Sequence, residues 1–324
     1  MMAGQRSDSA SISVIRQDLG LNKPKWKQYF KYLNDVSPLS VHETTNQAGY
    51  LYLDKTIYKP FIKIAGLNKH MCLVIKFPYL HRSYQSKRKV TDIIRETLPN
   101  TFILATVSIV FATILGIFFG IQVAIHKDTW IDRAVLIFTT LGMSLPSFFA
   151  AILIGWIFAF VLGHYTHLNL TGNLVVLDDY GDGIHYEWKN IILPAFTLGI
   201  RPLSIFIQLT RNSLLESLSQ DYIRTARAKG LNETKVIYKH ALKNALNPVI
   251  TSISGWFASL MAGVVFIEYI FAWKGLGYII VDGLTNYDLP LVLGCVMTIS
   301  VIFVIINIVV DFLYALIDPR VKLY

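Results

Sequence analysis

From about residue 98 onwards, the chain alternates between long apolar stretches and shorter polar connections. The two longest stretches, 101–125 and 134–163, contain no charged residue. Three shorter ones follow at 191–210, 249–267 and 289–310. Each is long enough to cross the roughly 30 Å of hydrocarbon in a bilayer as a helix. The pattern predicts five transmembrane helices, because apolar helices buried inside soluble proteins rarely run this long.

Composition agrees with an all-α integral membrane protein. Hydrophobic residues make up 53% of the chain and charged residues 16%, and the mean hydropathy is +0.47, outside the range typical of a soluble domain. The pattern divides the chain into an N-terminal region at 1–97, a membrane domain at 98–318 that includes a polar hairpin at 212–247, and a short tail at 319–324.

Charge in the connections predicts the orientation. The basic hairpin and tail are placed in the cytoplasm, and the acidic connections at 164–190 and 268–288 outside. This puts the N-terminal region outside as an extracytoplasmic segment, although residues 1–95 hold 16 of the 30 basic residues and 6 of the 21 acidic ones. Long segments can be translocated despite their charge. We also expect a further membrane helix to precede Met1 in the natural protein.

The hairpin at 212–247 is predicted to form two short helices with a break between them. The first runs over about 220–229 and ends at Gly230, a residue type that tolerates left-handed backbone after a helix. Asn232 can cap the second helix, which must stop or kink at Pro248. The hairpin as a whole has an excess of basic side chains, which suits a docking surface for a partner. The simpler alternative is a basic loop that is only solvated.

Several residues interrupt the apolar stretches. Pro146 predicts a kink in the second stretch. Arg201 lies in the third, where a charge is costly unless it faces a polar cavity or pairs with an acid. We expect Arg201 to line a pathway or bind a substrate carboxylate, with an ion pair to Glu268, Asp311 or another subunit as the alternative. A tight turn rich in glycine and aromatic residues follows the fourth stretch, and its geometry suits a gate over an opening on the outer side. The candidate pathway and gate residues are Arg201, Pro146, Glu268, Trp273, Gly275 and Gly277.

Other features predict packing or lipid contact. Gly116 and Gly120 have the spacing that permits two helices to approach closely. The segment 25–33 predicts an amphipathic helix that either lies on the membrane surface or packs onto the rest of the N-terminal region. The basic cluster at 82–89 suits a lipid headgroup or a protein partner better than nucleic acid.

The sequence contains no constellation that indicates catalysis or a metal site. Cys72 and Cys295 are too few for a disulfide framework and are expected to be free thiols. His164 and His167 have a spacing that metal ligands use, without an obvious third ligand. No Walker A pattern is present, so ATP would have to bind to another chain. These absences count against a membrane-embedded enzyme, and they leave a transport subunit and a channel as the alternatives.

The hairpin resembles the EAA loop of the ABC importer permeases, and more narrowly that of the dipeptide, oligopeptide and nickel permeases. The residues that carry this resemblance are Asp221-Tyr222-Ile223-Arg224-Thr225-Ala226-Arg227-Ala228-Lys229-Gly230-Leu231 and His240-Ala241-Leu242-Lys243-Asn244-Ala245-Leu246. Further matches are Ser144-Leu145-Pro146-Ser147-Phe148, Glu268, Phe271, Trp273, Gly275, Leu276, Gly277 and Asp318-Pro319-Arg320. The resemblance covers most of 82–324 and, more loosely, 12–40.

This resemblance implies the ABC importer permease fold, with the family's first helix missing here. It implies the first of two permease chains of an ATP-driven importer in the bacterial cytoplasmic (inner) membrane, translocating di- or oligopeptides by alternating access. The implied partners are a second permease chain, two ABC ATPase subunits, an extracytoplasmic peptide-binding protein and membrane lipid, without nucleic acid. No cofactor is expected in this chain, because ATP and Mg would bind to the ATPases. Nickel import is the alternative within the family.

The resemblance also assigns the hairpin to ATPase coupling. Arg224 stands where the general motif has a Glu and Lys243 where it has a closing Pro, variants usual in the peptide branch. Arg201-Pro202 is not a general feature of the family. The coupling candidates are Asp221, Arg224, Thr225, Ala226, Arg227, Gly230, His240, Leu242 and Asn244.

Overall fold

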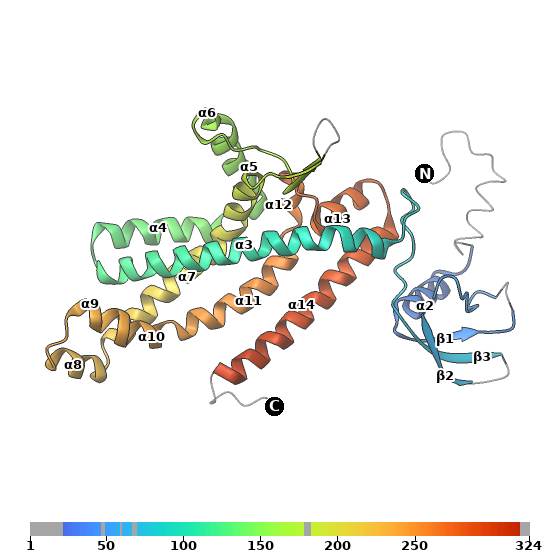
Figure 1. Cartoon of the computed structure of the whole chain (residues 1–324), viewed down its shortest axis with the longest axis horizontal. Coiled ribbons are helices and arrows are strands. Elements are labelled where there is room, and N and C mark those ends of the chain that lie inside the picture. Colours follow the sequence, from blue (N-terminus) through green and yellow to red (C-terminus); the bar gives the residue numbers. More distant parts are fainter. Residues whose placement is uncertain (1–21, 47–48, 59, 67–69, 178–182, 318–324) are drawn as a thin grey trace. The chain divides into compact units, whose positions relative to one another are not determined.

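A computed structural model shows a mainly helical chain (Figure 1). The structure describes residues 22–46, 49–58, 60–66, 70–177 and 183–317. Within them it divides into two compact units. The first comprises Met1–Ile94 and Gly283–Gly294, and the second comprises Arg95–Asp282 and Cys295–Tyr324.

The first unit contains a helix and a small antiparallel sheet. Its elements are α2 (Lys25–Val36), β1 (Leu39–Glu43), β2 (Phe61–Gly66) and β3 (Met71–Lys76), with strand order β1-β3-β2. Burial alternates along β3, where Cys72 and Val74 join Leu53 and Tyr58 in a small core. Alternation is expected when only one face of a sheet is covered.

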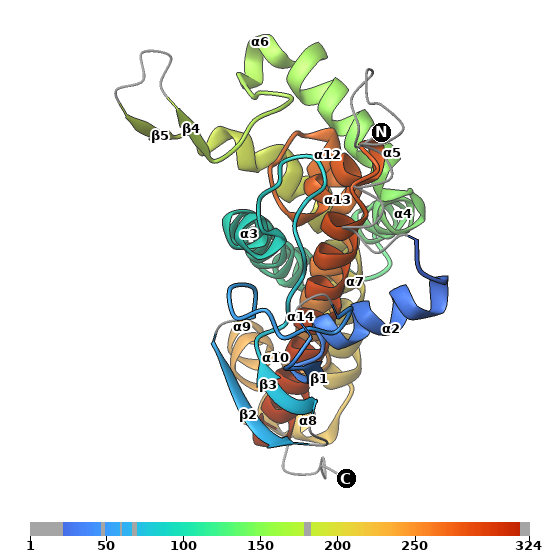
Figure 2. The same ribbon diagram turned by 90° about the vertical axis from the view of Figure 1, so that its right-hand side faces the viewer.

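The prediction of an all-α protein was therefore wrong for this unit. The signal for a strand was present, because Leu73, Val74 and Ile75 form a short run rich in β-branched residues between polar flanks. The second unit adds a two-stranded antiparallel pair, β4 (Val175–Leu177) and β5 (Ile184–Tyr186). Figure 2 shows this pair projecting beside the helices of its unit.

The predicted amphipathic helix at 25–33 is confirmed as part of α2. Its apolar face does not pack into the core, since Trp26, Tyr29 and Phe30 are 60%, 59% and 62% exposed. The expectation that this face packs onto the rest of its unit was therefore wrong. The unit's core is instead small and formed around the sheet.

The second unit is mainly helical; of its helices, α3 and α14 begin within the first unit and α13 ends within it. The helices, which include the π-helical segments η1 and η2, are α3 (Val90–Ile125), α4 (Trp130–Ser144), α5 (Ser147–Gly155), η1 (Trp156–Val161), α6 (Gly163–Thr166), α7 (Lys189–Leu218), α8 (Asp221–Ala228), α9 (Glu233–Lys235), η2 (Val236–Ala241), α10 (Leu242–Ala245), α11 (Asn247–Gly263), α12 (Val265–Ile270), α13 (Leu276–Thr285) and α14 (Leu289–Ile317).

Among the described residues, three helices are long and apolar enough to cross a membrane: α3, α7 and α14 over Leu289–Val310. The bent pair of α4 and α5–η1 adds a fourth if it counts as one span. The predicted number of five is not confirmed, because α11 has 17 residues and a short break at Val264 separates it from α12. Hydropathy alone did not reveal where these helices end.

Helices α3 and α7 pack closely, and Figure 1 shows α4 running beside them. A Cβ placed on Gly116 would lie 2.6 Å from Phe206 Cβ, and one on Gly120 would lie 2.5 Å from Thr210 Cβ. Both distances are shorter than any normal carbon contact, so only glycine permits this approach. The prediction that this glycine pair brings two helices together is confirmed.

Candidate functional site

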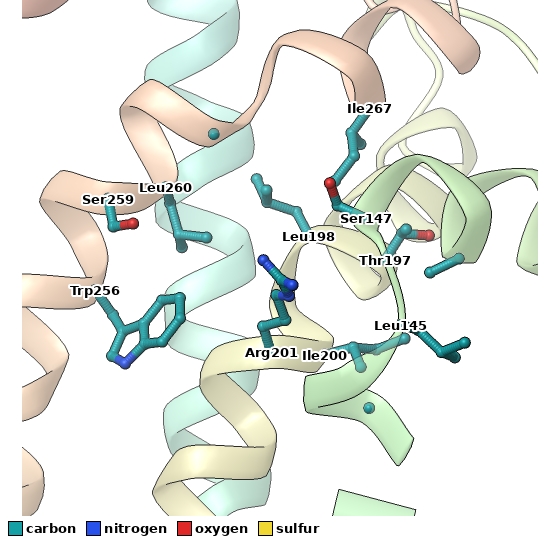
Figure 3. A pocket seen from close by; sticks show the side chains of 13 residues that line it. Leu145, Ser147, Thr197, Leu198, Ile200, Arg201, Trp256, Ser259, Leu260 and Ile267 are labelled. Atoms are coloured by element: carbon teal, nitrogen blue, oxygen red, sulfur yellow. The ribbon is translucent and has the colours of Figure 1, made fainter. Parts of the chain in front are cut away.

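A cavity of about 110 Å³ lies where the α4–α5 break faces α7 and α11 (Figure 3). The chain turns by 113° between α4 and α5. Pro146 has φ −59° and ψ 135°, an extended conformation that separates the two helices. The kink predicted at this proline is confirmed, and it is sharp. The lining residues are Gly142, Leu145, Ser147, Ala150, Thr197, Leu198, Ile200, Arg201, Trp256, Ser259, Leu260, Gly263 and Ile267.

Arg201 is the charged residue of this lining. It projects from α7, and Figure 3 shows its guanidinium in the space between Leu198 and the α11 side chains Trp256 and Leu260. Within the part of the chain that the structure describes, no carboxylate forms an ion pair with it. Of the alternatives to a pathway role, the ion pair with Glu268 is therefore wrong. The side chain of Asp311 lies outside what the structure describes.

Glu268 is fully buried and lies in a separate hydrogen-bonded cluster. Its Oε1 accepts a 2.7 Å bond from the Thr101 hydroxyl, and its Oε2 accepts a 2.7 Å bond from the Gly277 amide and a 3.2 Å bond from the Tyr278 amide. The Thr101 hydroxyl in turn accepts from the Leu276 amide at 2.8 Å. The carboxylate thus satisfies amides at the start of α13 that have no partner within the helix.

The predicted turn after α12 is present, and its glycines are explained by this cluster. A Cβ on Gly275 would overlap the Glu268 carboxylate and the Thr101 hydroxyl, and one on Gly277 would overlap the backbone of Val265. Trp273 is also fully buried and donates from Nε1 to the Asn100 carbonyl at 3.0 Å. Gly277 lies in the first turn of α13 rather than in the loop.

The structure therefore separates the predicted pathway and gate residues into two sets. Arg201 lines the cavity, and Pro146 forms the break beside it, between the lining residues Leu145 and Ser147. The other residues form the buried cluster that joins α12 and α13 to α3; these are Glu268, Trp273, Gly275 and Gly277. They do not line the cavity.

The hairpin has the two helices and the break predicted for it. Helix α8 ends at Ala228, and Gly230 follows with φ +76°. The Asn232 side chain accepts from the Thr234 amide at 3.3 Å and caps the next helix, while Pro248 lies in the first turn of α11. A π-helical segment, η2, interrupts the second helix. No feature of the sequence considered above predicted this π-helical segment.

One face of α8 anchors the hairpin and the other is exposed. Ile223 and Ala226 are buried against Leu214, Val236 and Ala245. The remaining coupling candidates on this segment are exposed; these are Asp221, Arg224, Thr225, Arg227 and Gly230. On the second helix His240 and Leu242 are half-buried, and Asn244 is exposed and donates to the Tyr222 hydroxyl at 3.2 Å.

Charged side chains of the hairpin pair with one another. Arg227 donates from Nε to Glu233 Oε1 at 2.7 Å and from Nη2 to Oε2 at 3.2 Å. This pairing lowers the pKa of the Glu233 carboxyl and raises the pKa of Arg227. Arg224 lies 3.3 Å from Asp221, one turn away on the same helix. The Arg227–Glu233 pair links the helices on either side of Gly230.

An ion pair that the sequence analysis missed joins α4 to α7. Arg211 donates from Nε and Nη2 to the two carboxylate oxygens of Asp132, both at 2.7 Å, and Asp132 is only 3% exposed. Such bidentate pairs are geometrically specific. No sequence signal indicates which acid faces Arg211, because the partners are 79 residues apart.

The cysteines and histidines do not form a metal site in the described chain. Cys72 and Cys295 are both buried, and neither forms a disulfide. The rings of His164 and His167 are 6.4 Å apart. Within the described ranges, no three His, Cys, Asp or Glu residues are grouped so that they could hold a metal ion.

Comparison with known proteins places this architecture in a family. The model of the binding-protein-dependent transport system inner membrane component matches residues 112–323. The dipeptide transport system permease protein DppB of Alkalihalophilus pseudofirmus is 32% identical, over 98% of this chain and 88% of that protein. The glutathione transport system permease protein GsiC of Escherichia coli K12 is 31% identical, over 99% and 88%.

Solved structures agree at the level of the fold. An inward-facing structure of the MetNI methionine ABC transporter aligns with a TM-score of 0.55 at 14% identity, over 70% of this chain and 96% of that one. An amino acid ABC transporter crystallised with histidines aligns with a TM-score of 0.52 at 12% identity, over 71% and 95%.

The chain therefore belongs to the family of binding-protein-dependent transport system inner membrane components. It is a permease subunit of an ABC importer, homologous to the dipeptide and glutathione permeases. The resemblance inferred from the hairpin and the Glu268 segment is confirmed.

Proposed function

We propose that this subunit translocates di- or oligopeptides by alternating access, together with a second permease chain, and that the α4–α5–α7–α11 cavity belongs to the pathway. The observation that carries the proposal is the cavity itself, because a helix broken beside an arginine opens a space with a charged side chain in its lining. The names of the homologous dipeptide and glutathione permeases support peptides over nickel as the cargo.

The hairpin at 212–247 would transmit ATP-driven motion from two partner ATPases, which bind ATP and Mg. Its buried face fixes it to α7 and its exposed face remains available. Gly230 is exposed, and a Cβ placed there would meet no atom within 4 Å. A partner can therefore approach the backbone at this point. A peptide-binding protein would deliver the cargo on the extracytoplasmic side, to which the charge pattern assigns the 164–190 and 268–288 connections.

Replacing Gly230 tests the coupling. Gly230→Ala and Gly230→Trp both place a side chain at φ +76° and share the same backbone strain, about 1 kcal/mol. Only Trp adds bulk that excludes a partner. We expect Gly230→Trp to abolish co-purification of the ATPase and transport, while Gly230→Ala retains most of both. Equal effects of the two changes would contradict docking at this position, and Gly163→Trp, at another open glycine, controls for bulk alone.

A further inference from the structure

The position of Arg201 requires an explanation that packing does not supply. Arg201 lies about 18 Å along α7 from its first residue, at about 1.5 Å per residue, within a helix long and apolar enough to span a bilayer. A cation at such a depth is retained only when it faces water or an anion. Arg211 on the same helix meets this condition by pairing with Asp132. Arg201 has no corresponding partner among the described residues.

The cavity around Arg201 is suited to an anion. None of its lining residues is acidic, and apart from Arg201 its polar side chains are the hydroxyls of Ser147, Thr197 and Ser259 and the indole of Trp256. With no acidic side chain in the lining to neutralise it, the guanidinium can form a charge-assisted bond with an incoming carboxylate. Its planar geometry also favours two parallel hydrogen bonds to one carboxylate.

The cavity, of about 110 Å³, has room for a terminal carboxylate beside Arg201. Leu198, Leu260 and Ile267 supply apolar wall for the carbon atoms.

We propose that Arg201 binds the C-terminal carboxylate of the peptide as it passes through the subunit. This rests on the proposed function, because it names the cargo group that the cavity recognises. Ser147 and Ser259 supply hydroxyls beside the carboxylate, from α5 and α11 respectively. A cargo without a free carboxylate would leave the guanidinium unpaired, at a cost in affinity.

Thiol protection on the assembled transporter tests this directly and needs no binding protein. Gly263→Cys, at a lining position where a Cβ meets no atom within 4 Å, is introduced into a chain with Cys72→Ala and Cys295→Ala, and its labelling rate is measured with added peptide. A peptide with a free carboxylate is expected to slow labelling at least several-fold, and its C-terminal amide to have little effect. Arg201→Gln should remove the protection, and Arg201→Lys should restore part of it.

Transport provides the second readout, with Arg133→Gln, the loss of an exposed arginine outside the cavity, as the matched control. We expect Arg201→Gln to lower uptake of the free-carboxylate peptide about tenfold and Arg133→Gln to leave it unchanged. Protection by the amide, by inorganic phosphate, or in Arg201→Gln would overturn the assignment. If the wild-type transporter moves no peptide of either kind, the proposed function itself fails, whatever the protection assay shows.

Discussion

At the scale of single residues, the Glu268 carboxylate packs directly against the backbone of Gly275. The fully buried carboxylate accepts bonds from Thr101 and from amides of α13, and Gly275 lies against it where any side chain would overlap. Arg201 is the opposite case, an exposed charge beside open space. The Glu268 carboxylate is therefore fully hydrogen-bonded within the protein. Arg201, in contrast, has no ion-pair partner among the described residues.

Substituting Gly275 by Ala is expected to destabilise the protein by about 1–3 kcal/mol, because the added methyl must displace the Glu268 carboxylate or the Thr101 hydroxyl. The control is Gly255→Ala within α11, where a Cβ meets no atom within 4 Å and alanine favours the helix. Thermal unfolding in detergent should show a lower Tm for the first variant and an equal or higher Tm for the second. A Gly275→Ala variant as stable as wild type would contradict the close packing described here.

At the scale of elements, local rules predicted the hairpin and the α4–α5 break. Gly230, Asn232, Pro146 and Pro248 act through the backbone of their own neighbourhood, and each lies where its residue type predicts. The sheet was missed because its strands have only five or six residues each and because β1 pairs with β3, which is distant in sequence, although β2 and β3 are neighbours along the chain. Glu268 and Thr101 meet across 167 residues, which no local pattern encodes.

The first unit contains a buried polar cluster around the end of α2. Asp35 Oδ1 accepts a 2.7 Å bond from the Tyr58 hydroxyl, Lys76 Nζ donates to the Asp35 carbonyl oxygen, and His81 Nε2 lies 3.3 Å from Asp35 Oδ2. Burial lowers the pKa of His81, and Asp35 opposes this shift. Burial and the Lys76 charge lower the pKa of His42, which lies in the same unit. Both imidazoles are therefore neutral in the folded unit at neutral pH.

This cluster predicts that the first unit loses stability in acid. The unfolded chain protonates His42 and His81 below about pH 6.5. Because the folded pKa values are lower than this, the unfolded state binds more protons and stability falls as pH drops below about 6.5. We expect labelling of Cys72, buried in β3, to accelerate between pH 7 and 5 relative to a denatured reference, in a Cys295→Ala background.

The pH effect should be at most about tenfold per pH unit for each histidine. His42→Gln with His81→Gln should flatten the pH profile. His70→Gln, at an exposed histidine that contacts Thr45, should leave it unchanged. A profile that is flat in the wild type, or that persists in the double variant, would show that these imidazoles do not control the stability of the unit.

At the scale of the whole molecule, the sequence predicted a membrane protein and its family correctly. It predicted the number and the ends of the membrane-spanning helices less well. The charge-free run at 101–125 predicted α3, and the apolar runs at 191–210 and 289–310 predicted α7 and α14. Apolar runs of this length are rare outside membrane-spanning helices. The second and fourth predicted spans, 134–163 and 249–267, failed as simple helices for different reasons. One contains Pro146 and turns by 113°, and the other is divided at Val264.

The chain's membership in the importer family, the exposed hairpin and the Arg201 cavity together lead to one prediction about the whole protein. A permease with a hairpin exposed on one face and a cavity at a helix break should depend on other chains for energy. Its central test is therefore transport in a defined system. The components that the proposed function calls for are this chain, a second permease chain, two ATPases and a binding protein.

The most direct measurement is uptake of a labelled dipeptide by proteoliposomes that contain this chain with its partners. We predict uptake that requires ATP, Mg and the ATPase subunits and that stops when any one of them is omitted. The Gly230→Trp variant should remain in the membrane and show no uptake. Uptake by this chain alone, or at the same rate without ATP, would contradict the account and favour a channel.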